Sequence, residues 1–141
     1  MKTAVLLIAH GSRREEANAD LRRTAEALDL RMPERLVETA YLELVPPTIP
    51  EGLARCRDQG ASEIRMTPYF LSAGAHVMTD LSRFRDAFAV ENPDILVKLC
   101  PPLGGHPLMI DILLQRVEET LDEDGEISSD LEETREEHAT P

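Results

Sequence analysis

Short apolar stretches alternate with segments of helical periodicity along this chain of 141 residues. Residues 3–9 form an almost continuous apolar run, which is typical of a strand buried on both faces of a parallel sheet. Residues 14–31 follow, with Leu21, Ala25 and Leu28 at positions i, i+4 and i+7 among charged residues. This spacing predicts an amphipathic helix after the first strand.

The same alternation continues to residue 121. Further strands are predicted at residues 35–42, 63–71 and 94–99, and further helices at residues 49–59, 77–90 and 107–121. Strands separated by helices in this order predict right-handed βαβ units and a parallel sheet. We therefore expect a single-domain α/β fold with three layers, α/β/α, built on a four-stranded parallel sheet.

The segment 122–141 differs in composition from the rest of the chain. It contains nine acidic residues, one basic residue, Arg135, and only two large apolar residues, Ile127 and Leu131. Such a segment buries too little apolar surface to offset the entropy lost on ordering. We expect an α/β domain over residues 1–121 and an acidic, largely disordered tail over residues 122–141.

Composition and charge exclude several classes of protein. The formal net charge is −12, and a broad nucleic-acid interface would require a basic surface. No stretch approaches the roughly 20 apolar residues that span a bilayer, and the apolar start is too short for a secretory signal. Cys56 and Cys100 form neither a CxxC pair nor a zinc-ligand pattern, so we expect reduced thiols in or near the core. These features favour a cytoplasmic protein with no membrane partner.

Histidines follow three of the four predicted strands. Ligands of open parallel sheets bind beyond the carboxyl ends of the strands. His10, His76 and His106 fall at such junctions, and Glu43 follows the remaining strand. Neutral imidazole binds divalent Fe, Co, Ni and Zn, and it can also accept a proton near pH 7. We expect His10 and His76 to converge, with Glu43 beside them.

Four stretches at these junctions resemble the short-form sirohydrochlorin chelatases, a class II chelatase family that inserts cobalt or iron into a modified tetrapyrrole. The stretches are His10-Gly11-Ser12-Arg13, Leu42-Glu43 followed by Pro47-Thr48-Ile49-Pro50, Pro68-Tyr69-Phe70-Leu71 with Gly74 and His76, and Pro102-Leu103-Gly104 with His106-Pro107. The resemblance covers about residues 3–121 and implies a chelatase-like fold.

The resemblance implies that His10 and His76 are the catalytic pair, acting both as metal ligands and as proton acceptors. Glu43 matches an acidic position of the family and is a further candidate metal ligand. For His106 two roles stay open, one in orienting the loop before the last helix and one in the reaction.

The resemblance also implies a binding site for the substrate's carboxylates. Ser12, Arg13 and the backbone of Gly74 and Ala75 are the candidate contacts, because helix N-termini favour anions. For Arg13 a purely solvated position is an equal alternative.

The implied activity is ATP-independent insertion of a divalent metal into sirohydrochlorin, in cobalamin or siroheme biosynthesis. The metal is a substrate, with cobalt expected first, iron second and nickel open. No nucleotide is expected, and the chain contains no GxxxxGK[ST] loop. Long-form relatives resemble two fused units, so the resemblance implies a homodimer that binds the tetrapyrrole in a shared cleft.

Two other functions stay open at the level of the sequence. One is a non-catalytic carrier of metal or tetrapyrrole on the same fold, which differs from the enzyme in turnover. The other is a doubly wound binding or signalling module with structural histidines, which predicts no metal affinity.

Overall fold

The computed structural model describes residues 1–122 of the chain. The chain divides into one compact unit over Met1–Gly104 and a second unit that begins at Gly105. The tail expected to be acidic and disordered lies, from residue 123 onward, outside the described residues. The domain expected over residues 1–121 stays a prediction.

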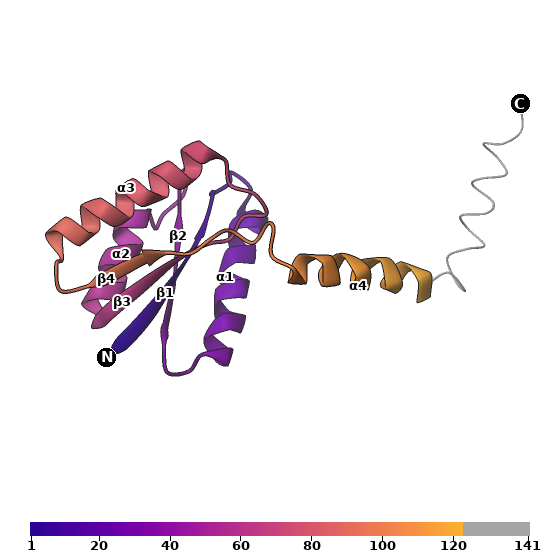
Figure 1. Ribbon diagram of the computed structural model, residues 1–141, viewed down its shortest axis with the longest axis horizontal. Helices are drawn as coiled ribbons and strands as arrows, with labels where there is room; N and C mark the ends of the chain where they lie inside the picture. Colours follow the sequence, from indigo (N-terminus) through magenta and orange to yellow (C-terminus); the bar gives the residue numbers. More distant parts are fainter. Residues whose placement is uncertain (123–141) are drawn as a thin grey trace, which may run out of the picture. The chain divides into compact units, whose positions relative to one another are not determined.

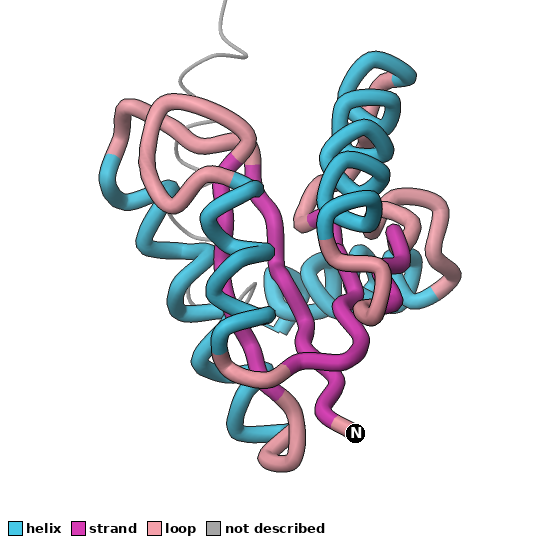
Figure 2. The backbone as a smooth tube through the Cα atoms, turned by 90° about the vertical axis from the view of Figure 1, so that its left-hand side faces the viewer, coloured by secondary structure: helices cyan, strands magenta, loops and turns pink. Residues whose placement is uncertain are grey.

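The first unit alternates strands with helices, as the sequence predicts (Figure 1). Its elements are β1 (Lys2–Ala9), α1 (Glu15–Arg31), β2 (Leu36–Tyr41), α2 (Ile49–Asp58), β3 (Ala61–Pro68), α3 (Ala75–Glu91) and β4 (Leu96–Leu99). The alternation can be followed along the backbone in Figure 2. All pairings are parallel, in the order β2-β1-β3-β4, which confirms the expected four-stranded parallel sheet.

The inner strand β1 is apolar from Ala4 to Ala9 because helices cover both faces of the sheet. On one face, Leu7 of β1 is buried with Leu21 and Ala25 of α1. On the other face, Leu6 and Ile8 are buried in a larger core to which α2 and α3 contribute. Successive strand residues point to opposite faces, so a run without alternation is what a doubly covered strand requires. The expected three layers are confirmed.

Several boundaries differ from the expected ones by one to three residues, and two of these lie at the candidate site. Strand β3 ends at Pro68 rather than at residue 71, and α3 begins at Ala75 rather than at residue 77. Proline has no N–H to donate, which limits further strand pairing at that position. Gly74 has an extended backbone at the helix N-cap, so the next residue can enter the helix. His76 consequently lies in the first turn of α3, not in the preceding loop.

The second unit contains α4 (Leu108–Asp122), which begins directly after Pro107. The ring of His106 accepts a hydrogen bond at Nδ1 from the backbone N–H of Leu108, at 3.1 Å. This bond satisfies one of the unpaired N–H groups at the start of the helix. The observation favours the orienting role for His106. Within residues 1–122, no helix has the length and apolar character that crossing a membrane demands.

Both cysteines are free thiols, and they differ in accessibility. Cys56 of α2 is buried, while Cys100 after β4 is half-buried. Burial, aided by the charge of Glu38, raises the pKa of the Cys56 thiol from 9.0 to about 12. At pH 8 the Cys56 thiol therefore stays protonated and unreactive, because the thiolate is the nucleophile.

We predict that a thiol reagent at pH 8 labels Cys100 well before Cys56 in the folded protein. Peptide mapping by mass spectrometry measures the two positions separately, and labelling in denaturant is the control in which both react. Equal labelling of both thiols in the folded protein would contradict this labelling prediction.

Because the Cys56 pKa is higher in the folded protein, the free energy of unfolding should fall as the pH rises from about 9 towards 12.

Candidate metal and tetrapyrrole site

The junctions after β1, β2 and β3 lie side by side, because β1 pairs with both of the other strands. Backbone hydrogen bonds continue across these junctions beyond the strand ends. The N–H of Glu43 donates to the C=O of His10 at 2.9 Å, and the N–H of Tyr69 donates to the C=O of Ile8 at 2.7 Å. The structure thus brings the His10 and Glu43 backbones together, as expected for neighbouring strand ends.

The chain passes so closely over β2 at Gly11 that no side chain fits there. Gly11 has a φ of +89°, and a Cβ atom at this position would overlap the carbonyl oxygen of Glu43. A positive φ is readily adopted by glycine and is uncommon for other residues. Gly11 therefore allows the loop with His10 to rest directly on the loop with Glu43.

The loop after β2 makes a tight turn at Leu44. The N–H of Val45 donates to the C=O of Glu43 at 2.9 Å, and Leu44 between them has a φ of +72°. This is the geometry of a γ-turn, a rare and strained arrangement for a non-glycine residue. Leu44 is 58% exposed. Leu71 and Leu103, in the loops after β3 and β4, are exposed as well.

The imidazole of His10 rests against a buried aromatic ring. The ring centroids of His10 and Phe70 are 4.6 Å apart with an interplanar angle of 46°. Phe70 follows β3 and is only 6% exposed, whereas His10 is exposed. Neither ring nitrogen of His10 is hydrogen-bonded to another of residues 1–122. The contact with Phe70 limits the orientations of the imidazole, and its nitrogens stay available to a ligand.

His76 is exposed in the first turn of α3. The N-cap of this helix is Gly74, which supplies no side-chain cap, and the first turn contains no acidic residue. The backbone N–H groups of this turn can therefore bind an anion. The predicted carboxylate contacts at Gly74 and Ala75 are compatible with this geometry and stay predictions.

Ser12 and Arg13 lie in the loop between β1 and α1. The hydroxyl oxygen of Ser12 accepts a hydrogen bond from the N–H of Arg14 at 3.0 Å, so it organises the entry to α1. Its hydroxyl hydrogen can still donate to a ligand. Arg13 is exposed and forms no salt bridge with any of residues 1–122, which leaves its guanidinium available for a carboxylate.

A single copy does not assemble a complete set of metal ligands. Among residues 1–122, no three His, Cys, Asp or Glu side chains gather in a way that could hold a metal ion. The structure places His10 and Glu43 on adjoining loops, but it does not bring the expected trio of His10, His76 and Glu43 into one cluster.

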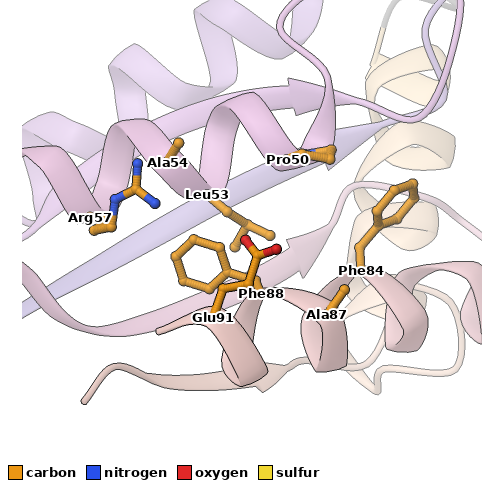
Figure 3. A pocket seen from close by; sticks show the side chains of 8 residues that line it. All are labelled: Pro50, Leu53, Ala54, Arg57, Phe84, Ala87, Phe88 and Glu91. Carbon is orange, nitrogen blue, oxygen red and sulfur yellow. The ribbon is translucent and has the colours of Figure 1, made fainter. Parts of the chain in front are cut away.

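A separate groove of about 310 Å³ lies between α2 and α3 (Figure 3). Leu53, Phe84 and Phe88 provide its apolar lining, and Arg57 and Glu91 also line it. None of the candidate metal ligands or carboxylate contacts is among the residues that line it. This groove is therefore distinct from the candidate metal site.

Three residues that support the site were given no role in the sequence analysis, namely Asn18, Tyr41 and Phe70. Asn18 is only 3% exposed and is the one buried polar or charged residue of the described core. A signal was present in the sequence, because Asn18 shares the apolar phase of its helix with Leu21 and Ala25. An amide on a core-facing side of a helix needs hydrogen-bond partners.

Comparisons with known proteins point to one family. The family model that matches is described as CbiX, and it matches residues 4–120. The chain is 32% identical over 117 residues to the chloroplastic sirohydrochlorin ferrochelatase of Arabidopsis thaliana, across 83% of this chain and 52% of that protein. It is 30% identical over 128 residues to the sirohydrochlorin cobaltochelatase of Priestia megaterium, across 91% of this chain and 42% of that protein.

A solved structure shows the same fold. The sirohydrochlorin chelatase SirB from Bacillus subtilis subspecies spizizenii, in complex with cobalt, matches with a TM-score of 0.76 and 28% identity, across 84% of this chain and 51% of that chain. The chain thus spans about half the length of the relatives named here.

Proposed function

This chain belongs to the CbiX family, and on that premise we propose that it inserts a divalent metal ion, Co²⁺ or Fe²⁺, into sirohydrochlorin without ATP. The observation that carries the proposal is the position of His10. It stands at the carboxyl end of β1, exposed, with both ring nitrogens available and its ring resting on Phe70.

The chemistry of metal insertion suits neutral imidazoles. The macrocycle loses two pyrrole N–H protons, and the metal ion moves from its protein ligands to the ring nitrogens. We assign His10 and His76 to both tasks, as ligands of the incoming ion and as acceptors of the released protons. Glu43 supplies a carboxylate oxygen to the ion before transfer.

The surroundings of these groups suit a flat, polycarboxylic substrate. Arg13, Ser12 and the N-terminal turn of α3 supply donors for its carboxylates. The exposed leucines Leu44, Leu71 and Leu103 add apolar surface in the loops after β2, β3 and β4, which suits the face of a macrocycle.

Cobalt is our first assignment for the metal and iron the second. Histidine and carboxylate ligands accept Co, Ni, Fe and Zn, so the ligand types alone set no strict preference. Proteins named for cobalt and for iron are both among the relatives. We place the reaction in the cytoplasm, in cobalamin or siroheme biosynthesis.

The test is a direct assay of insertion. Purified protein is mixed with sirohydrochlorin and Co²⁺, Fe²⁺ or Ni²⁺ in turn, and the visible spectrum of the macrocycle is followed against a reaction without protein. We expect accelerated conversion with Co²⁺, and a rate no faster than the uncatalysed one with all three ions would contradict the proposal. Tight binding of metal or macrocycle without turnover would indicate a carrier.

We further propose that the active form is a homodimer. One copy assembles no three-ligand metal group within residues 1–122, and a large polycarboxylic macrocycle needs contacts on more than one side. Sedimentation equilibrium across the concentrations used for the assay should show a dimer. A monomer at every concentration with full activity would remove the shared cleft from the proposal.

A further inference from the structure

We propose that Asn18 and Tyr41 are positioning residues that hold the backbone of His10 in place for metal binding. We refer to Asn18 and Tyr41 together as the loop clamp. The inference rests on the proposed role of His10 as a metal ligand, and its test separates the two.

Asn18 binds both polar groups of Ser12's backbone from the first turn of α1. Its Oδ1 accepts a hydrogen bond from the N–H of Ser12 at 2.9 Å, and its Nδ2 donates to the C=O of Ser12 at 2.8 Å. The paired bonds hold the loop two residues after His10 in one register against the helix. Because the amide is buried, losing either bond would leave an unsatisfied polar group.

Tyr41 joins the same helical turn to the end of β2. Its hydroxyl donates to the C=O of Asn18 at 2.7 Å, and its side chain is only 2% exposed. Two residues further along the chain, the N–H of Glu43 donates to the C=O of His10. A closed circuit therefore begins and ends at His10. It runs along the backbone to Ser12, through hydrogen bonds to Asn18 and on to Tyr41, and along the backbone to Glu43, which bonds to His10.

The circuit encloses Gly11, the most permissive residue of the loop. Glycine adopts many backbone conformations, so the chain on its own would not hold His10 in one position. A metal ligand must be held within about 0.5 Å of its working geometry by the groups around it. The loop clamp supplies this restraint through the backbone on either side of His10's loop, at Ser12 and at the end of β2.

The protein offers a control for an amide that binds backbone, in the half-buried Asn92. Nδ2 of Asn92 donates to the C=O of Phe88 at 3.0 Å, at the carboxyl end of α3. Asn92 thus performs a similar local task at the other end of the helix from His76. A general loss of stability should affect Asn92 and loop-clamp variants alike, whereas a loss of positioning should affect only the loop clamp.

The experiment measures the affinity for Co²⁺ alone, by calorimetric titration of the full chain without macrocycle. Asn18→Asp keeps the shape of the side chain but removes the Nδ2 donor, and Tyr41→Phe removes only the hydroxyl. Both should raise the Kd for Co²⁺ by roughly 10–100-fold, the range usual for residues that orient a metal ligand. Asn92→Ala should leave the Kd unchanged, even at a comparable fall in Tm.

Tyr41→Phe decides the matter if Asn18→Asp does not fold. Wild-type affinity in the folded loop-clamp variants overturns the inference, and so does an equal loss of affinity in Asn92→Ala. His10→Ala is measured alongside them to separate the two proposals. If His10→Ala loses Co²⁺ while the loop-clamp variants keep it, only the positioning role fails. Wild-type affinity in His10→Ala overturns the assignment of His10 as a ligand, and the positioning role with it.

Discussion

Replacing His10 or His76 by alanine is expected to abolish metal insertion almost completely while the protein stays folded. Both side chains are exposed, one at the end of β1 and one in the first turn of α3, so neither contributes much to the core. Each replacement removes a ligand lone pair and a proton acceptor together. We expect the initial rate to fall by at least about 10²-fold, in the range for loss of a general base.

The assay follows the visible spectrum of the macrocycle, and circular dichroism shows whether each variant is folded. His106→Ala is the comparison variant, because its ring accepts a hydrogen bond from Leu108 at the start of α4. We expect it to reduce the rate much less than the other two replacements. Wild-type rates in both His10→Ala and His76→Ala would refute the proposed mechanism.

Gly11→Ala is expected to be one of the most damaging small substitutions in the first unit. The added Cβ would overlap the carbonyl oxygen of Glu43, and the backbone has a φ of +89°. A positive φ alone costs an L-residue about 1–2 kcal/mol, and the overlap forces the loops after β1 and β2 apart. We expect the free energy of unfolding to fall by more than about 2 kcal/mol. We expect the rate of metal insertion to fall as well, because His10 is displaced.

Urea unfolding followed by circular dichroism measures the first of these effects. Gly74→Ala is the matched control, because a Cβ at Gly74 meets no atom within 4 Å and its φ is −65°. Because alanine is a poorer N-cap than glycine, we expect this control to lose at most about 1 kcal/mol of stability. If Gly11→Ala and Gly74→Ala unfold at the same urea concentration, the tight approach of the two loops plays no part in stability.

Much of the architecture could be predicted from the chain because it follows from local pattern. The continuous apolar run over 3–9 indicates a strand covered on both faces, and β1 is buried in that way. Helical spacing of Leu21 and Ala25 predicts the buried side of α1. The rule for open parallel sheets then places His10 and Glu43 at neighbouring strand ends, as the structure confirms.

Boundaries were predicted less well, because they depend on single residues that compete with the pattern. The apolar residues Tyr69, Phe70 and Leu71 continue the strand-like composition of β3, yet the strand ends at Pro68. Phe70 instead turns into the core and supports the ring of His10. The position of His76 was mispredicted for a similar local reason. Gly74 has the extended backbone of an N-cap, so α3 begins at Ala75 and His76 lies in the helix rather than in the loop.

By itself, the sequence determined the order of the elements, the parallel sheet and the edge on which His10 and Glu43 stand, since periodicity and turn residues act over a few positions. Only the tertiary structure decided what holds the site together. The bonds of Asn18 to Ser12, of Tyr41 to Asn18 and of Glu43 to His10 join three elements through residues up to 33 positions apart. Such contacts exist only once β2 lies beside β1 and α1 packs over both, and no local pattern encodes which groups then meet.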